Sequence, residues 1–300
     1  MALFDFYLFV DFSASAKPSP KNPSADCLWV ACKHQQEKAT THYFRTRHKA
    51  FNFICITLEN LIRNGNKVFA GFDFPFAFSH PLIKTKSQTP WLENWELLFG
   101  LISDNESNGN NRFEIASVIN SNLGGEYPGP FWGCPKAKTN NFLNSKSPKF
   151  PYELSKEIFI SRLRLAEQRL PGTQEAWKLY GIGSAGSQGL VGIPYLMRLK
   201  KKWGNKIKVW PMETGFTKNP TDKAEIVLAE VWPSILKKND SSRKNEKLIK
   251  DQAQVLELAN WASQLDQKDK LEEYFNTPPS LSVQEFIQCI SLQGWIFGAV

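Results

Sequence analysis

The stretch FYLFVDFSAS, residues 6–15, decides how the chain begins to fold. Residues 4–12 are a run of large, mostly aromatic apolar side chains of strand length, which predicts a buried β-strand. Asp11 lies inside this run. An ionised carboxylate in a buried strand is costly unless it has a partner or a metal ion. The position of Asp11 therefore suggests that this strand serves a site as well as the core.

The segments that follow predict a sheet of mixed direction. Strands are expected at residues 26–33 and 40–45, and the short gaps before them indicate an antiparallel meander. A helix is expected at residues 48–64, where apolar side chains recur at helical spacing, and a buried strand at residues 67–73. The predicted order is strand, strand, strand, helix, strand.

We predict an α/β protein with one domain, residues 1–300, and a helical and loop-rich insertion at residues 81–190. Residues 237–247 are charged and are expected to form a mobile insertion, whereas the apolar C-terminal sequence GWIFGAV is expected to pack into the core. The remaining expected elements are helices at residues 91–101, 113–122, 190–203 and 251–265 and strands at residues 207–210 and 226–232.

Composition narrows the function classes. The formal net charge of +8 suits binding to nucleic acid or other anions, although a basic surface more often serves solubility. The five cysteines form no CxxC pair, which argues against a zinc ribbon or a disulfide framework. No apolar run approaches the roughly 20 residues that span a bilayer, and no secretory signal is evident. We expect a cytoplasmic protein with no membrane partner and no obligate protein partner.

Three acidic residues interrupt or end predicted buried strands. Asp11 lies in FVDFS, Asp73 in GFDFP and Glu230 in VLAEVWP, whereas Asp251 opens a predicted helix, where an acid commonly complements the helix dipole. One such acid alone could cap a turn, but the set together indicates converging carboxylates. Phosphodiester hydrolysis with divalent metal ions needs such a set, because Mg²⁺ prefers oxygen ligands.

Eight segments, spread over nearly the whole chain, carry a resemblance to a known family: VDFSASAKPSPKNPSAD, YFRTR, GFDFPFAF, GSAGSQGLVGIP, VWPMET, EVWPS, KDQAQVLELANW and GWIFG. In these segments the chain resembles a bacterial family of uncharacterised proteins with a predicted ribonuclease H-like nuclease domain. Some members of that family are labelled as cobalamin or molybdopterin-guanine-dinucleotide biosynthesis proteins. The ribonuclease H-like fold has a three-strand antiparallel meander, then a helix and parallel strands, with acids side by side on its first and fourth strands.

This resemblance implies a metal-dependent nuclease. In it, Asp11, Asp73, Glu230 and Asp251 would be the catalytic residues and would hold Mg²⁺ or Mn²⁺. Many ribonuclease H-like enzymes carry closely spaced acids on their last helix, whereas here Asp251 is followed by Gln-Ala-Gln. This departure leaves the number of metal ions open.

Nine further residues are candidates for binding a substrate, each with a purely structural role as the alternative. The run YGIGSAGSQG, residues 180–189, contains a literal G-x-G-x-x-G, but no strand precedes it as a dinucleotide-binding fold requires. We expect a flexible loop there, either lining the acidic cleft and cradling a phosphate or serving structure alone. The candidates are Ser13, Ser15, Lys17, Arg45, Arg47, Ser187, Gln188, Glu213 and Lys250.

The leading hypothesis is a divalent-metal-dependent nuclease that hydrolyses phosphodiesters of nucleic acid. A nucleotide- or small-phosphate-using enzyme, of kinase or ATPase type, is the alternative with the same sheet topology. A non-catalytic binding protein is the third, and its acids would not converge. The sequence leaves open whether the substrate is DNA, RNA, a branched nucleic acid or a small phosphate.

Overall fold

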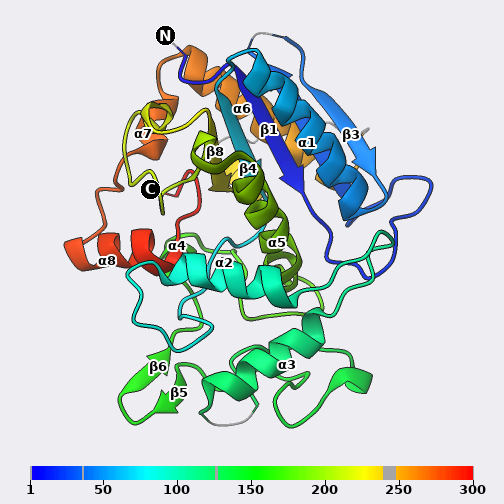
Figure 1. Ribbon diagram of the computed structural model, residues 1–300, viewed down its shortest axis with the longest axis vertical. Coiled ribbons are helices and arrows are strands. Elements are labelled where there is room, and N and C mark those ends of the chain that lie inside the picture. The colour runs from blue at the N-terminus through cyan, green and yellow to red at the C-terminus, as the bar shows by residue number, and fades with distance from the viewer. Residues whose placement is uncertain (1, 36, 126–127, 239–247, 300) are drawn as a thin grey trace.

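The computed structural model of the chain describes residues 2–35, 37–125, 128–238 and 248–299 (Figure 1). A six-stranded mixed sheet runs through it in the order β3-β2-β1-β4-β8-β7. Pairing is antiparallel from β3 to β1 and parallel from β1 to β7. The strands are β1 (Phe6–Asp11), β2 (Leu28–His34), β3 (Thr40–Phe44), β4 (Val68–Phe72), β7 (Ile207–Val209) and β8 (Ile226–Glu230).

Alternate residues of β1 face two separate buried clusters. Leu8 and Val10 belong to the cluster shared with α1 (Arg47–Arg63) and α5 (Ala185–Trp203). Tyr7 and Phe9 belong to the cluster shared with α6 (Lys250–Gln267) on the opposite face. Because strand side chains alternate, Asp11 continues the row that faces α6. The alternation of side chains in β1 thus determines that Asp11 lies on the face of the sheet covered by α6.

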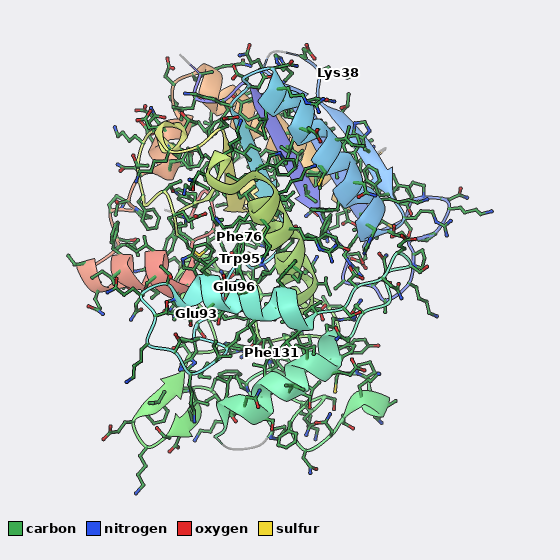
Figure 2. The ribbon with its side chains drawn as sticks, in the orientation of Figure 1. Lys38, Phe76, Glu93, Trp95, Glu96 and Phe131 are labelled. Atoms are coloured by element: carbon green, nitrogen blue, oxygen red, sulfur yellow. The ribbon has the colours of Figure 1, made fainter. Side chains whose placement is uncertain are left out.

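The segment between β4 and α5 packs below the sheet in Figure 1. Its helix α2 contacts α5, and Figure 2 shows Phe76 and Trp95 where the two helices meet. Trp95 Nε1 donates a hydrogen bond to the Phe76 carbonyl oxygen (2.6 Å), so α2 holds the turn that follows Asp73. The segment comprises α2 (Pro90–Leu101), α3 (Arg112–Leu123), the antiparallel pair β5 (Tyr152–Ser155) and β6 (Ile158–Ile160), and α4 (Leu165–Arg169).

The C-terminal part returns to the sheet. Phe297 N donates to the Glu230 carbonyl oxygen (2.8 Å), and Trp295 and Ile296 are buried, so the expected packing of this end into the core is confirmed. The remaining helices are α7 (Leu271–Phe275), α8 (Val283–Gln288), a π-helical turn (Cys289–Gln293) and 3₁₀ turns at Lys136–Lys138, Gly204–Lys206, Pro220–Asp222 and Pro233–Lys238.

The predicted α/β class is confirmed, with a mixed sheet, antiparallel and then parallel, flanked by helices. The expected strands and helices occur with ends within two residues of prediction, with one exception. Beyond its first two residues, the charged insertion expected at residues 237–247 lies outside the described part of the chain. Within the described residues, no helix has the length and apolar character needed to cross a membrane.

The exception is the glycine-rich run, where a loop was expected up to residue 189. Helix α5 instead begins at Ala185, and the reason is close packing. A Cβ on Gly189 would lie 3.0 Å from the Pro75 carbonyl oxygen, and one on Gly192 would lie 2.5 Å from the Phe74 ring. Glycine here lets α5 approach the chain that follows β4.

Substituting Gly192→Ala should lower the free energy of unfolding by about 1 to 2 kcal/mol, because overpacking against Phe74 outweighs the helix-propensity gain of about 1 kcal/mol. Gly100→Ala is the matched control, since it lies in α2 with nothing within 4 Å of the new Cβ, and it should stabilise. Urea unfolding measures both. Equal effects of the two substitutions would contradict the packing role of Gly192.

Candidate functional site

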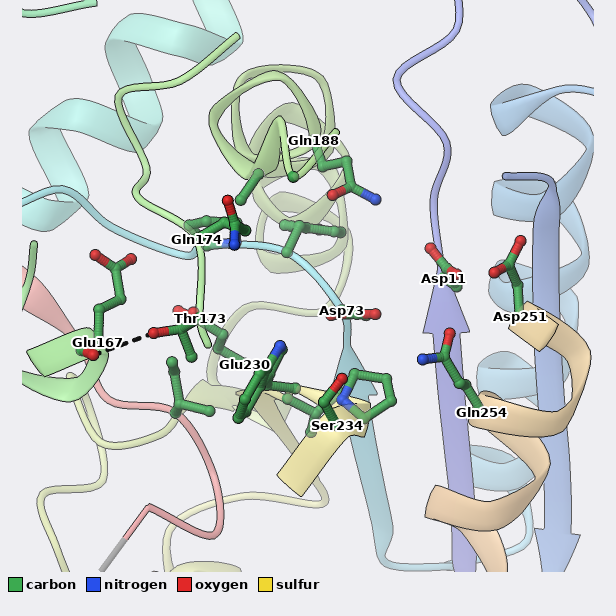
Figure 3. Close-up of a pocket in the computed structure, with 18 of the residues that line it drawn as sticks. Asp11, Asp73, Glu167, Thr173, Gln174, Gln188, Glu230, Ser234, Asp251 and Gln254 are labelled. Atoms are coloured by element: carbon green, nitrogen blue, oxygen red, sulfur yellow. Dashed lines mark hydrogen bonds between the residues drawn. The ribbon is translucent and has the colours of Figure 1, made fainter. Parts of the chain in front are cut away.

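A pocket of about 240 Å³ lies at the carboxyl ends of β1, β4 and β8 (Figure 3). This edge of an open α/β sheet is where ligands commonly bind. The polar lining is strongly unbalanced in charge. Among the described residues that line the pocket, two are cationic, Arg164 and Lys250, and six are acidic: Asp11, Asp26, Asp73, Glu167, Glu230 and Asp251.

Asp11 and Asp73 lie side by side at the ends of neighbouring parallel strands. Val10 pairs with Phe72, and Asp73 N donates to the Val10 carbonyl oxygen (2.9 Å), which places the two acids at matching positions. Figure 3 shows both carboxylates in the pocket. Asp11 is only 8% exposed. Within the described part of the chain, neither carboxylate accepts a hydrogen bond or forms an ion pair, and Lys250 acts on them only as a nearby charge. Both carboxylates line the pocket.

The surroundings of these two carboxyl groups favour their neutral forms. Burial raises the pKa of Asp73 from 3.8 to about 8, and the charges of Glu230 and Asp251 add to the shift. Burial also raises the pKa of Asp11 well above its usual value, with Asp73 and Asp251 contributing, while Lys250 opposes both shifts. A bound proton or a bound cation relieves the same strain.

Asp251 reaches this pair from the other layer. It lies in the first turn of α6, is buried, and accepts a hydrogen bond from Cys27 N (3.2 Å). Burial raises its pKa, while hydrogen bonds from the backbone of Cys27 and Asp26 lower it. In Figure 3 Asp251 and Gln254, one turn further along α6, lie beside the end of β1. The helix therefore brings a third carboxylate to the pocket.

Glu230 also lines the pocket, but its carboxylate oxygens are already bonded. Arg164 donates from Nη2 to Oε1 (2.5 Å) and from Nη1 to Oε2 (2.8 Å), and Phe76 N donates to Oε2 (2.9 Å). Arg164 also donates from Nε to Glu167 (2.8 Å). A buried carboxylate with this many donors fits an anchoring role, since Phe76 belongs to the turn that follows Asp73.

Nothing in the sequence around Arg164 singles it out, because it lies 66 residues before its partner Glu230 in the chain. It is 1% exposed and stands at the start of α4. Burial acts to lower its pKa, but the charges of Glu167 and Glu230 raise the pKa above its usual value, so the guanidinium stays protonated. Removing one partner of such a buried pair would leave the other charge buried and unpaired. Loss of either partner should therefore destabilise the protein.

Arg47 and the loop after Asp11 form a second network, whose side chains do not line the pocket. Arg47 is buried against Asp104 (2.6 Å) and donates from Nη1 to the carbonyl oxygens of Ser13 (2.6 Å) and Ser15 (3.0 Å). Ser15 Oγ donates to the Lys17 carbonyl oxygen (3.1 Å). The structure thus uses Arg47 to hold the loop that follows β1.

The other predicted binding residues divide between the pocket and the scaffold. Gln188 and Lys250 line the pocket, together with Thr173, Gln174 and Ser234, which the sequence did not single out. Three others are bonded elsewhere: Ser187 with Leu179 and Arg112, Glu213 with Lys200, and Arg45 with Ser19.

The donor set fits one kind of metal ion better than another. No group of three or more His, Cys, Asp or Glu side chains placed to hold one ion occurs among the described residues. Mg²⁺ commonly binds through one or two carboxylates, with waters and substrate phosphate completing its shell. Two unpaired carboxylates at one pocket fit that pattern, and Mn²⁺ takes the same oxygen ligands. A closed structural zinc site needs four protein ligands and does not fit.

No family model, no curated protein and no solved structure matches the chain. The resemblance drawn from its sequence segments therefore stays a prediction, and a functional assignment rests on the pocket.

Replacing Asp73→Asn should stabilise the metal-free protein at pH 8 by about 1 to 2 kcal/mol, because the amide removes the cost of ionising a buried carboxyl group beside other acids. A raised folded-state pKa means that the folded protein binds a proton the unfolded chain has released, so stability falls as pH rises from 3.8 to about 8. The gain should vanish below pH 3.8, where both forms are protonated. Urea unfolding across this range measures it.

Glu157→Gln serves as the control, because it removes an exposed carboxylate between β5 and β6 that does not line the pocket. Its stability difference should not change with pH. An Asp73→Asn difference that is constant with pH, or that is destabilising at pH 8, would contradict the strained pair.

Proposed function

We propose that the protein is a divalent-metal-dependent phosphodiesterase that cleaves nucleic acid on a ribonuclease H-like scaffold. The observation that carries the proposal is the pair Asp11 and Asp73, unpaired and drawn together at the ends of adjacent parallel strands. The sheet order supports the scaffold, because the first and fourth strands are neighbours, β1 ends in Asp11 and β4 is followed directly by Asp73. The convergence of Asp251 on the same pocket speaks against scattered structural acids.

The residues of the pocket have distinct roles in this proposal. Asp11 and Asp73 hold Mg²⁺ or Mn²⁺, and Asp251 adds negative charge from α6. The ion supplies positive charge that polarises a phosphoryl oxygen and makes water a better nucleophile. Lys250 offsets part of the acidity when the pocket is empty. The raised pKa values of Asp11 and Asp73 agree with these roles, because a bound cation would stabilise their charged forms.

Glu230 takes a positioning role instead of the ligand role expected from the sequence. Its bond to Phe76 N, supported by its bonds to Arg164, fixes the chain three residues beyond Asp73. A ligand must offer a lone pair to the ion, and the oxygens of Glu230 are engaged by three donors. We assign the pair Arg164 and Glu230 to holding Asp73 in place.

A small phosphate ester is the second candidate substrate. The pocket, at about 240 Å³, is smaller than the 300 Å³ or more of typical drug-sized sites, so it takes a phosphate group more readily than a whole nucleotide. The phosphate group of a nucleic acid and that of a small ester would both fit a pocket of this volume. The substrates in the assay separate them.

Asp11→Asn and Asp73→Asn should each reduce Mg²⁺-dependent cleavage by about 100-fold or more, the effect of removing one key electrostatic group from an active site. The assay uses single-stranded and double-stranded DNA, RNA, a branched DNA and p-nitrophenyl phosphate. Cleavage of the polymers alone supports the nuclease, and cleavage of the nitrophenyl ester alone supports the second candidate.

Glu213→Gln is the control for this assay, because it removes an acid that pairs with Lys200 outside the pocket. Its activity should stay within about threefold of the wild type, since effects of distant charges on a site are small. Full activity in both aspartate variants would refute the mechanism.

A further inference from the structure

The first turn of α5 forms the wall of the pocket next to the strand ends. Ala185 and Gln188 line the pocket. Gln188 Nε2 donates to the carbonyl oxygen of Phe12 (3.0 Å), the residue directly after Asp11. Gly189 allows the helix to sit against Pro75, two residues after Asp73. The helix start therefore touches the chain that leaves both acid-bearing strands.

This wall suits an anion. Helix α5 is 19 residues long, its N-cap Ser184 makes no side-chain capping bond, and its first turn contains no acidic residue. The positive end of a helix dipole and its terminal N–H groups favour negative charge. Gly186 N already donates to the Lys178 carbonyl oxygen (3.0 Å), and Ser187 N donates to the Ser184 carbonyl oxygen (3.1 Å). Ala185 N has no hydrogen-bond partner among the described residues, and Ala185 lines the pocket, so this N–H and the helix dipole are what α5 offers to an anion.

Two side-chain amides stand at the same wall. Gln174 lies close to Gly183, because a Cβ at that position would meet Gln174 Oε1 at 2.3 Å, and Gly183 has a φ of +72° that favours glycine. Gln174 Nε2 donates to the Gly172 carbonyl oxygen (3.4 Å), which uses one of its two N–H donors. Figure 3 shows Gln174 and Gln188 on the same side of Asp73. A primary amide has two N–H donors, and Gln188 uses one of them on Phe12, so one stays available.

Asp11 supplies the independent sign of a ligand. It is 8% exposed, lines the same pocket, and has no partner within the described residues, so it marks a place for a cation. The pocket holds six acidic and two cationic side chains, and an anion alone would be repelled. A volume of about 240 Å³ is about eight waters at roughly 30 Å³ each, enough for a hydrated ion and one phosphate group.

We infer that the start of α5, with the side-chain amides of Gln174 and Gln188, binds a phosphate group of the substrate, and that it does so only when Asp11 and Asp73 hold a divalent cation. This inference rests on the proposed function and adds the group of the substrate that the pocket recognises. In this arrangement Asp11 and Asp73 would hold the cation, and the start of α5 with the two glutamine amides would bind the phosphate group.

Calorimetric titration of the full chain tests this with inorganic phosphate and with a thymidine dinucleotide carrying or lacking a 5′-phosphate. Binding of phosphate should require Mg²⁺. Ala185→Asp places a carboxylate at the first position of α5, where it is compatible with the helix, and should weaken phosphate binding by about tenfold or more. Ala185→Asn, which has the same shape without the charge, should stay within about threefold of the wild type.

Gln254→Glu is the positional control, because it adds a carboxylate to the same pocket from α6. It should weaken phosphate binding less than Ala185→Asp does. Tighter binding of the 5′-phosphorylated dinucleotide would indicate that α5 binds a terminal phosphate. Equal binding of both dinucleotides would indicate that it binds an internal phosphate, and either result supports the site.

Phosphate binding by the wild type without Mg²⁺, no phosphate binding with Mg²⁺ bound, or equal losses in Ala185→Asp and Ala185→Asn would each overturn the inference. The experiment measures binding and not turnover, so its result can be distinguished from a test of the proposed catalytic function. If the protein cleaves nucleic acid but Ala185→Asp and Ala185→Asn weaken phosphate binding equally, the inference fails and the proposed function stands. Mg²⁺-dependent phosphate binding without cleavage of any ester would defeat the proposed catalysis alone.

Discussion

The structure depends on one constraint, the placement of two carboxylates beside each other at the ends of parallel strands. The carboxylates of Asp11 and Asp73 accept no hydrogen bond from the described residues. Burial, and then the charges of neighbouring acids, raise the pKa of both. Such an arrangement costs folding free energy and persists where function requires it. Much of the surrounding structure holds this pair in place in a small pocket.

Three parts of the structure hold the pair from different directions. The Arg164–Glu230 ion pair anchors the turn after β4 through Phe76 N. Arg47 holds the loop after β1 through its carbonyl oxygens. Helix α5 packs closely through its glycines against the chain beyond β4 and bonds to Phe12. Rigid support of this kind is consistent with the proposed cation site, because a preorganised site holds its ligands in one geometry.

Local patterns predicted the layers of the fold and the two central acids. Apolar runs of strand length and helical periodicity identified the strands and helices, and an acid inside an apolar run identified Asp11 and Asp73. What failed was decided by contacts distant in sequence. The sequence predicts Glu230 as a ligand, and only the structure shows Arg164 bonded to its carboxylate. The run before residue 190 looks like a loop until Gly189 meets Pro75. Neither partner carries a local signal, because each acts through tertiary packing.

The central claim is that Asp11 and Asp73 together hold a divalent cation. Anomalous diffraction from crystals of the full chain soaked in Mn²⁺ tests it directly, because the signal locates the ion without any substrate. The account predicts one strong peak within coordination distance of both carboxylates, and its loss in crystals of the Asp73→Asn variant. A peak that contacts neither residue, or no peak in crystals that diffract well enough to show both carboxylates, would contradict the account.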